Sequence, residues 1–200
     1  MEVLITSKTR WSDCCCIGGL EITTGRFLRL MTSIGSYQPI NSPFQIGEVW
    51  DLNYRYHPGK PPHIEDVRVD RRQGPLRKLD DIAEFILQHC TVWQGNYNSL
   101  FSGKLKWTGN GSGHINNPSD LPTNSVGFWS SDRDLLWDGE RYYRYTRRLL
   151  AVDKRLPYKG MQPAIPVIPA GTLIRVSLAK WLPSERVEDR CYLQLSGWYL

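Results

Sequence analysis

The stretch from Arg141 to Lys159, RYYRYTRRLLAVDKRLPYK, holds the densest group of side chains that could bind a ligand. Seven basic residues stand there against one acidic residue, Asp153, and four tyrosines lie between them. Guanidinium groups pair with phosphates, and tyrosine rings stack on bases. We therefore expect contacts to single-stranded nucleic acid from Tyr143, Arg144, Tyr145, Arg147, Arg148, Lys154 and Arg155.

This basic stretch reads as part of a strand, so its residues alternate between two faces. Residues 141, 143, 145 and 147 would share one face, and residues 142, 144, 146 and 148 the other. Each face then mixes cations with aromatic rings. The alternative interpretation is a solvated strand whose aromatic rings pack on a neighbouring element.

A second basic group lies near the start of the chain. It contains Lys8, Arg10 and Trp11, with Arg26 and Arg29 on a following hairpin. Residues three apart on a strand face opposite sides. Only one of the two hairpin arginines can therefore share a surface with Lys8, and Arg29 is the candidate. Ordinary surface charge is the alternative.

Two tryptophans are further candidates for ligand contacts. Trp129 precedes Ser130 and Ser131 and could hold a base, although a core position is the alternative. Trp107 lies in the glycine-rich sequence GKLKWTGNGSG beside two lysines. A ring in such a loop could cover a ligand or anchor the loop.

The chain offers few residues for metal binding or catalysis. Only Cys14 and Cys16 of the triplet 14–16 could share an ion, since neighbours on a strand diverge, and buried thiols in a β core are expected instead. Glu65 and Asp66 diverge in the same way. No nucleophile or phosphate-loop motif is present. We therefore expect no catalytic residues, no metal and no cofactor.

The composition favours a turn-rich, mainly β protein. The chain has 13 prolines, 17 glycines, eight tryptophans and ten tyrosines in 200 residues. The net charge of +5 suits a polyanionic partner. The odd number of five cysteines and the lack of a secretory signal or membrane span favour a cytoplasmic protein.

The hydrophobic pattern predicts strands, one helix and a long polar loop. Strands are expected over 2–8, 15–23, 26–31, 47–56, 64–69, 127–137, 141–153, 171–181 and 190–199. A helix is expected over 79–89 and a polar connection over 94–125, so that one domain would span 1–93 and another 126–200. Gly18 and Gly19 within a strand indicate a bulge.

The order of these segments resembles a known family. The first half carries GRFLRL and GEVWDL, and the second carries FWSSDRDLLW, YYRYTRR, LIRVSLAKW and RCYLQLSGWY. This run resembles the dual OB-containing domain, a bacterial family predicted to hold two oligonucleotide-binding (OB) barrels. The loop over 94–125 and the cysteine triplet depart from it. The resemblance implies two OB-like barrels, the second closed by the last strand, and a recognition role in bacterial defence or effector systems.

Three functions remain open at this stage. The first is non-catalytic binding of single-stranded DNA or RNA, or of a nucleotide-derived ligand. The second is a protein-interaction adaptor that uses tryptophans as interface anchors. The third is a metal-dependent nuclease or nucleotide hydrolase that depends on Glu65 and Asp66.

Overall fold

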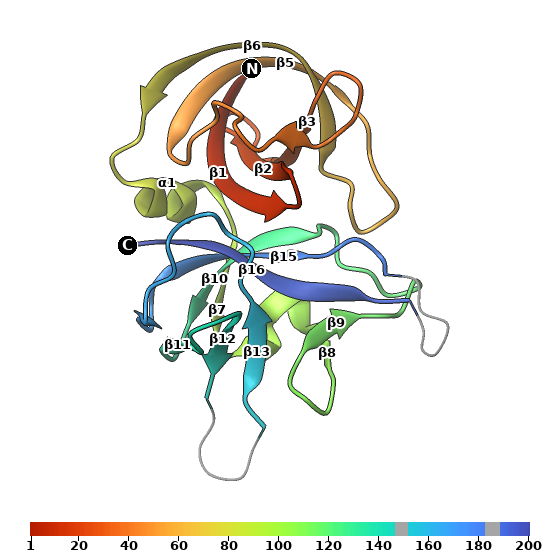
Figure 1. Cartoon of the computed structure of the whole chain (residues 1–200), viewed down its shortest axis with the longest axis vertical. Coiled ribbons are helices and arrows are strands. Elements are labelled where there is room, and N and C mark those ends of the chain that lie inside the picture. Colours follow the sequence, from red (N-terminus) through yellow and green to blue (C-terminus); the bar gives the residue numbers. More distant parts are fainter. Residues whose placement is uncertain (147–151, 183–188) are drawn as a thin grey trace. The chain divides into compact units, whose positions relative to one another are not determined.

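The computed structural model describes residues 1–146, 152–182 and 189–200. It divides the chain into two units, Met1–Cys90 and Thr91–Leu200 (Figure 1). Each unit has its own cluster of buried hydrophobic residues. The fold is mainly β, with OB-like barrel sheets and a short helix, which confirms the fold class predicted from the sequence.

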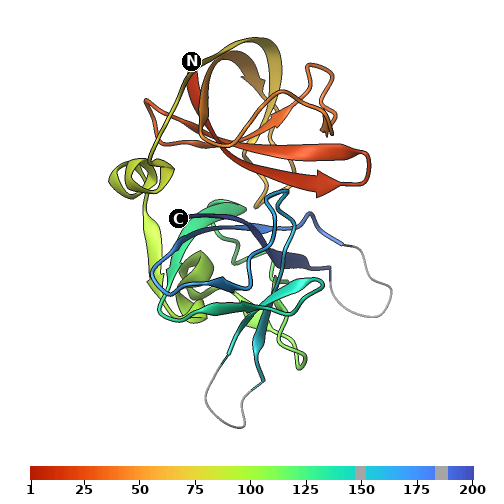
Figure 2. The same ribbon diagram turned by 60° about the vertical axis from the view of Figure 1, so that its left-hand side comes forward.

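The first unit is a closed five-stranded barrel. Its strands are β1 (Glu2–Trp11), β2 (Cys14–Glu21), β3 (Phe27–Met31), β5 (Glu48–Tyr56) and β6 (Asp66–Lys78). They follow the order β1-β5-β6-β3-β2, and β1 pairs with β2 to close the ring (Figure 2). Only the β3–β6 pair is parallel within this barrel. A closed Greek-key barrel of five strands is the OB-fold arrangement.

A bulge in β1 lies opposite the glycine pair of β2. Ile5 pairs with Gly19 and Ser7 with Gly18, so Thr6 is the extra residue. A Cβ atom on Gly19 would lie 2.7 Å from Cγ1 of Val3. Glycine is therefore required where β1 bends closely across β2, as the sequence predicted.

Other elements of the first unit differ in extent from the prediction. Strand β6 runs to Lys78 instead of ending at Val69. Its second half is solvent-exposed and has no apolar alternation, so the sequence carries no strand signal there. Helix α1 (Ile82–His89) begins later than predicted, since the side chain of Asp81 caps it by accepting from the Glu84 amide at 2.7 Å. The short strand β4 (Gln38–Pro39) pairs with the start of β2.

The second unit contains two sheets that form an OB-like half-barrel. The first has the order β7 (Val92–Gly95), β10 (Val126–Ser131), β15 (Leu173–Leu178), β16 (Cys191–Tyr199), β9 (Gly113–Ile115) and β8 (Lys106–Trp107). The second has the order β13 (Lys154–Pro157), β12 (Tyr142–Tyr145), β11 (Leu135–Trp137) and β14 (Val167–Ile168).

Several segments of the second unit differ from their predicted structure. The strand expected over 127–137 is divided into β10 and β11, and the one expected over 171–181 ends at Leu178. The polar connection over 94–125 contains the 3-10 helix η1 (Tyr97–Gly103) together with β8 and β9, and Leu100 and Phe101 contribute to the core. The strand expected over 141–153 is divided: β12 ends at Tyr145, and β13 begins at Lys154 as its antiparallel neighbour. Residues 147–151 lie outside the described part of the chain.

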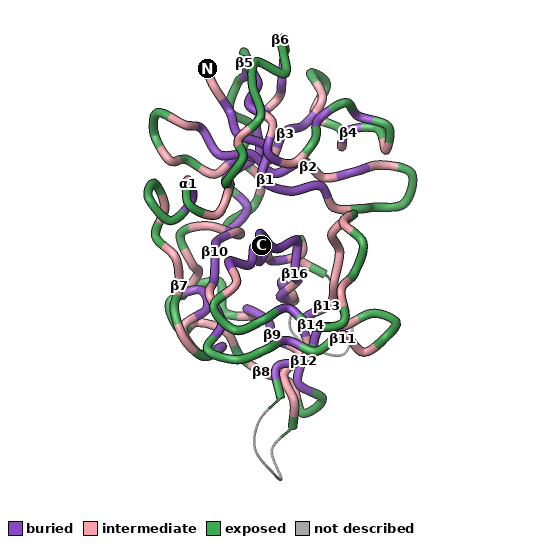
Figure 3. Tube along the Cα trace, turned by 90° about the vertical axis from the view of Figure 1, so that its left-hand side faces the viewer, coloured by how far each residue is buried: buried purple, intermediate pink, exposed green. Residues whose placement is uncertain are grey.

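Strand β16, near the end of the chain, is central to the second unit. It lies between β15 and β9. Its buried residues Cys191, Leu193, Leu195 and Trp198 belong to the hydrophobic core (Figure 3). In the part of the chain that the structure describes, no helix is both long and apolar enough to cross a membrane.

Deletion of residues 190–200 should unfold the second unit, because it removes a central strand and four core side chains. Urea unfolding followed by tryptophan fluorescence should show the loss of one cooperative transition. Deletion of Leu200 alone is the matched control, since that residue is 83% exposed. An unchanged unfolding curve for the longer deletion would contradict the assignment of β16 to the core.

Candidate nucleic-acid interface

The turn between β1 and β2 presents an exposed tryptophan. Trp11 ends β1 and pairs with Cys14 across a tight turn in which Ser12 has a φ of 51°. Its side chain is 57% exposed, and its ring centroid lies 6.3 Å from that of Tyr37. The preceding residue, Arg10, is also exposed. The turn therefore presents one aromatic ring and, on the other face of β1, a guanidinium group to solvent, and the half-buried Tyr37 lies near the ring of Trp11.

Arg29 lies on the barrel face formed by β2 and β3. It pairs with Gly18 of β2 and with Asp66 of β6. Burial is the largest single influence on the pKa of Arg29 and acts to lower it, but the hydrogen bond that its Nε donates to the Asp66 carboxylate and the nearby charges together raise that pKa. Cys16 and Tyr37 also act on this charge, so the Arg29 guanidinium is near both residues. Arg29 thus remains charged and fixed on this face.

Lys8 does not share the surface of Trp11 and Arg29. Its Nζ is buried and donates to the backbone carbonyl oxygens of Ser42 at 2.7 Å and Phe44 at 3.4 Å. These bonds tie β1 to the connection that precedes β5. The ammonium group of Lys8 therefore holds the barrel together and is not presented to a ligand.

Further residues that sequence analysis did not select extend the basic surface of the first unit. Arg26 lies over the ring of Tyr56, 4.8 Å from its centroid. Nη2 of Arg68 lies 3.0 Å from Nε2 of His57. Tyr37 belongs to the irregular connection after β3. No spacing in the sequence links Arg26 with Tyr56 or Arg68 with His57, so only the tertiary structure brings each of these pairs together.

In the second unit, Lys154 is surrounded by aromatic rings. Its Nζ lies 5.2 Å from the ring centroid of Tyr97 and 5.0 Å from that of Trp107. Tyr97 in turn packs edge-on against Trp107 and Tyr145, with centroids 4.9 and 5.2 Å apart. Trp107 is half-buried and packs on the core, as expected if it anchors its loop. We call these four residues the Lys154 cluster.

Three predicted stacking residues of the second unit are core residues. Trp129, Tyr143 and Tyr145 are at most 2% exposed. Nε1 of Trp129 donates to the carbonyl of Gly95 at 2.9 Å, and the tyrosine hydroxyls donate to the Ile165 carbonyl and the Asp132 carboxylate. Their rings cannot meet a ligand in this structure, because the alternation of the strands points them inward.

The predicted arginines of the second unit lie on the opposite strand face. Arg144 is exposed and pairs across the sheet with Arg155, which is half-buried. Nη2 of Arg144 also lies 3.8 Å from Oδ2 of Asp138. Arg147 and Arg148 were predicted contacts too, but they lie outside the described residues.

Asp138 organises the turn between β11 and β12. Its Oδ1 accepts from the amides of Glu140, Arg141 and Tyr142 at 3.0, 2.8 and 2.9 Å. Partial burial acts to raise the pKa of Asp138, but these three hydrogen bonds, with help from Arg144, lower it to about 2. The ionised carboxylate therefore fixes the turn that carries Arg141 and Arg144.

The thiols and carboxylates considered for a metal site are dispersed. Among residues 1–146, 152–182 and 189–200, no three His, Cys, Asp or Glu side chains form a group that could hold a metal ion. All five cysteines are free, and burial raises the pKa of Cys15. Asp66 is engaged by Arg29, and Glu65 is buried.

A family model described as the dual OB-containing domain matches residues 1–198 of the 200-residue chain. The chain belongs to the dual OB-containing domain family. No curated protein matches the chain, and no solved structure matches it.

The family assignment identifies which surface of the first barrel to consider. OB folds bind oligonucleotides on the face of their second and third strands and on the loops that follow the first and fourth strands. In this dual OB protein that face comprises β2 and β3, with Arg29. The first of the loops is the turn after Trp11, and the second connects β5 and β6 and includes His57. The Trp11–Tyr37–Arg29 group thus lies where OB folds bind ligands.

Substitution of Lys154 by Met should destabilise the second unit by about 1 kcal/mol, because it removes an ammonium group that faces two aromatic rings. Urea unfolding would measure the change. Lys106→Met is a suitable control, since Lys106 is an exposed neighbour of Trp107 on β8. Equal unfolding midpoints for the two variants would argue against a contribution from the Lys154 cluster.

Asp138 should add stability that depends on pH. Because its folded-state pKa is depressed from 3.8 to about 2, the stabilisation is complete above about pH 4 and is lost as the pH falls toward 2. The free energy of unfolding of Asp138→Asn should therefore approach that of the native protein over this range. A difference that stays constant between pH 6 and pH 2 would show that the charge is not responsible.

Proposed function

We propose that this dual OB protein binds single-stranded DNA or RNA, or a nucleotide-derived ligand, on the first barrel. The binding surface would comprise Trp11, Tyr37, Arg10 and Arg29. The observation that carries the proposal is the exposure of Trp11, at 57%, at the tip of a β-turn with Tyr37 beside it. Trp11 thus leaves a large apolar ring in water, at a position where OB folds bind ligands.

The chemistry of this surface suits a nucleic-acid strand. Stacking of one base on an aromatic side chain contributes about 1–3 kcal/mol and does not depend on the identity of the base. Arg10 is exposed beside Trp11 but points to the other face of β1, so it can pair with a phosphate farther along a bound strand rather than with that of the nucleotide stacked on Trp11. Arg29 lies on the same face as Trp11, where Asp66 holds its side chain in place and offsets its charge.

The proposed role is binding alone, with no reaction catalysed by the protein. Binding without catalysis is consistent with the recognition role that the family resemblance implies for bacterial defence or effector systems. On this view the ligand would be a nucleic-acid strand or a nucleotide signal that another component produces or acts upon.

Fluorescence titration with short single-stranded DNA and RNA tests the proposal. Stacked bases should quench Trp11, and Trp11→Ala should weaken binding about tenfold while Trp11→Phe retains most of the affinity. Affinity should fall steeply between about 50 and 200 mM salt, since phosphate contacts release counterions. Leu87→Ala is the control, because Leu87 is an exposed apolar residue of α1 at 53% exposure.

Two results would reject this function. One is the absence of saturable binding to DNA, RNA and mononucleotides at low salt. The other is binding that Trp11→Ala leaves unchanged. In either case, a partner protein that co-purifies at high salt with the native protein but not with Trp11→Ala would favour the adaptor alternative.

A further inference from the structure

A second polar site lies on the outer face of the first barrel, where β5 and β6 pair. Asp51 pairs with Gln73, Leu52 with Arg72, and Asn53 with Arg71. Leu52 is buried in the core, and the guanidinium carbon of Arg72 lies 5.5 Å from the ring centroid of Phe44. The alternation of both strands therefore places Asp51, Asn53, Arg71 and Gln73 together on the outer face.

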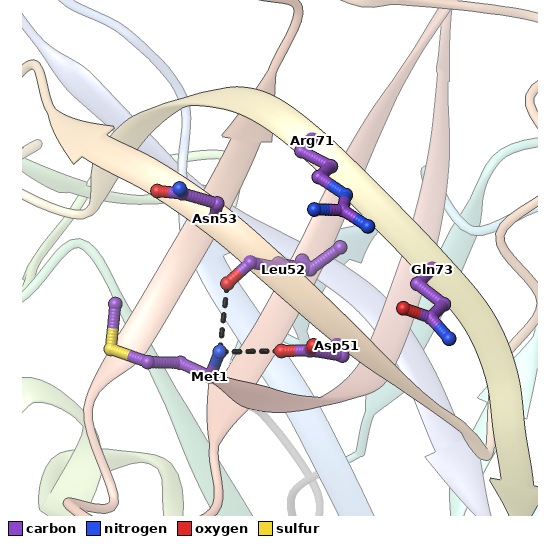
Figure 4. A pocket seen from close by; sticks show the side chains of 6 residues that line it. All are labelled: Met1, Asp51, Leu52, Asn53, Arg71 and Gln73. Atoms are coloured by element: carbon purple, nitrogen blue, oxygen red, sulfur yellow. Dashed lines mark hydrogen bonds and ion pairs between the residues drawn. The ribbon is translucent and has the colours of Figure 1, made fainter.

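This part of the outer face is hollowed. A groove of about 380 Å³ is lined by Met1, Asp51, Leu52, Asn53, Arg71 and Gln73 (Figure 4). The pairing of β5 with β6 shifts register on both sides of the groove, between Val49 and Asp51 and between Asn53 and Tyr54. Bulges increase the local twist of paired strands, which curves the ribbon around the groove. Its volume falls within the range of small-molecule sites.

Within the described part of the chain, Arg71 has no acidic partner, unlike Arg55 of β5 and Arg77 of β6. Arg55 pairs with Asp70, and Arg77 pairs with Glu2. Among the described residues, Arg71 makes neither an ion pair nor a side-chain hydrogen bond, and the same holds for Gln73. Figure 4 shows the guanidinium of Arg71 and the amide of Gln73 extending from β6 toward β5.

The charge of the groove favours an anion. The carboxylate of Asp51 is 2.6 Å from the amino group of Met1, so these two charges offset each other. The positive charge of Arg71 remains. A guanidinium group offers a planar fork of donors that matches two oxygens of one phosphate or carboxylate. The amide of Gln73 supplies a further donor from the neighbouring position on the same face of β6.

We propose that this groove binds a phosphate group, with Arg71 as the charged contact and Gln73 as a neutral one. A phosphate presents three oxygens, one more than a carboxylate, and can use the Arg71 fork and the Gln73 amide together. The phosphate could belong to a free nucleotide or to a nucleic-acid backbone. The site is separate from the Trp11 surface and does not require the function proposed for that surface.

Calorimetric titration with inorganic pyrophosphate tests the site on the full chain. Saturable binding is expected, and Arg71→Gln should weaken it about tenfold, the loss expected for one charge-assisted hydrogen-bonding group. Arg77→Gln is the matched control. It removes an arginine from the same strand, and it is combined with Glu2→Gln so that no carboxylate is freed beside Asp51; loss of this pair should change affinity less than about twofold. Gln73→Ala should give a smaller loss than Arg71→Gln.

The outcomes separate this site from general electrostatic attraction. Equal weakening by Arg71→Gln and by Arg77→Gln combined with Glu2→Gln, equal affinity for acetate and pyrophosphate, or no pyrophosphate binding would each overturn the proposal. Trp11→Ala should leave pyrophosphate affinity unchanged. Phosphate binding in the groove can therefore be confirmed even if nucleic-acid binding at the Trp11 surface is not.

The two sources of the phosphate are distinguished by a second titration. If Arg71→Gln weakens binding of a short oligonucleotide, the groove contacts the backbone of a strand. If it weakens binding of a nucleoside monophosphate but not of the oligonucleotide, the groove is a nucleotide site.

Discussion

The pairing of β1 with two neighbours is the constraint on which the first unit depends. Residues 2–4 of β1 bond to β5, while residues from Val3 to Trp11 bond to β2. Closing five strands into a ring requires β1 to curve from β5 toward β2, and the bulge at Thr6 opposite Gly18 and Gly19 supplies the bend. Beyond the bulge β1 has only β2 as a ladder neighbour, so the hairpin continues past the pairing with β5 and carries Trp11 into solvent. Closure of the barrel and exposure of the aromatic turn thus follow from the same geometry.

The arginines of this barrel show how one residue type takes different roles. Arg29 is held by Asp66, Arg55 by Asp70, and Arg77 by Glu2. These pairs fix the outer face of neighbouring strands. Arg71 has no such partner among the described residues and lines a groove. Whether an arginine of this barrel has its charge offset or stays available to a ligand therefore depends on whether a carboxylate of a nearby strand position reaches it.

The second unit uses its aromatic residues mainly for packing. Its core is rich in tryptophan and tyrosine, and the buried hydroxyls of Tyr143 and Tyr145 each donate to an acceptor. The basic, tyrosine-rich stretch near residue 141 was the strongest binding signal in the sequence. In the structure, alternation turns Tyr143 and Tyr145 inward and leaves Arg144 outside. Two of the tyrosines that the sequence offered for stacking are therefore used in the core, and Arg144 is left on the outer face.

The sequence by itself determined the β class, the turn-forming glycines, the helix near residue 82 and the central role of the final strand. These features depend on local alternation and on residues with special backbone freedom, which can be read along the chain. The tertiary structure alone decided that Lys8 is buried, that Tyr37 lies beside Trp11, that β6 extends to Lys78, and that Arg71 lacks a partner. Each depends on which strands become neighbours and in what register, and no local pattern encodes a contact between residues that are distant in the chain.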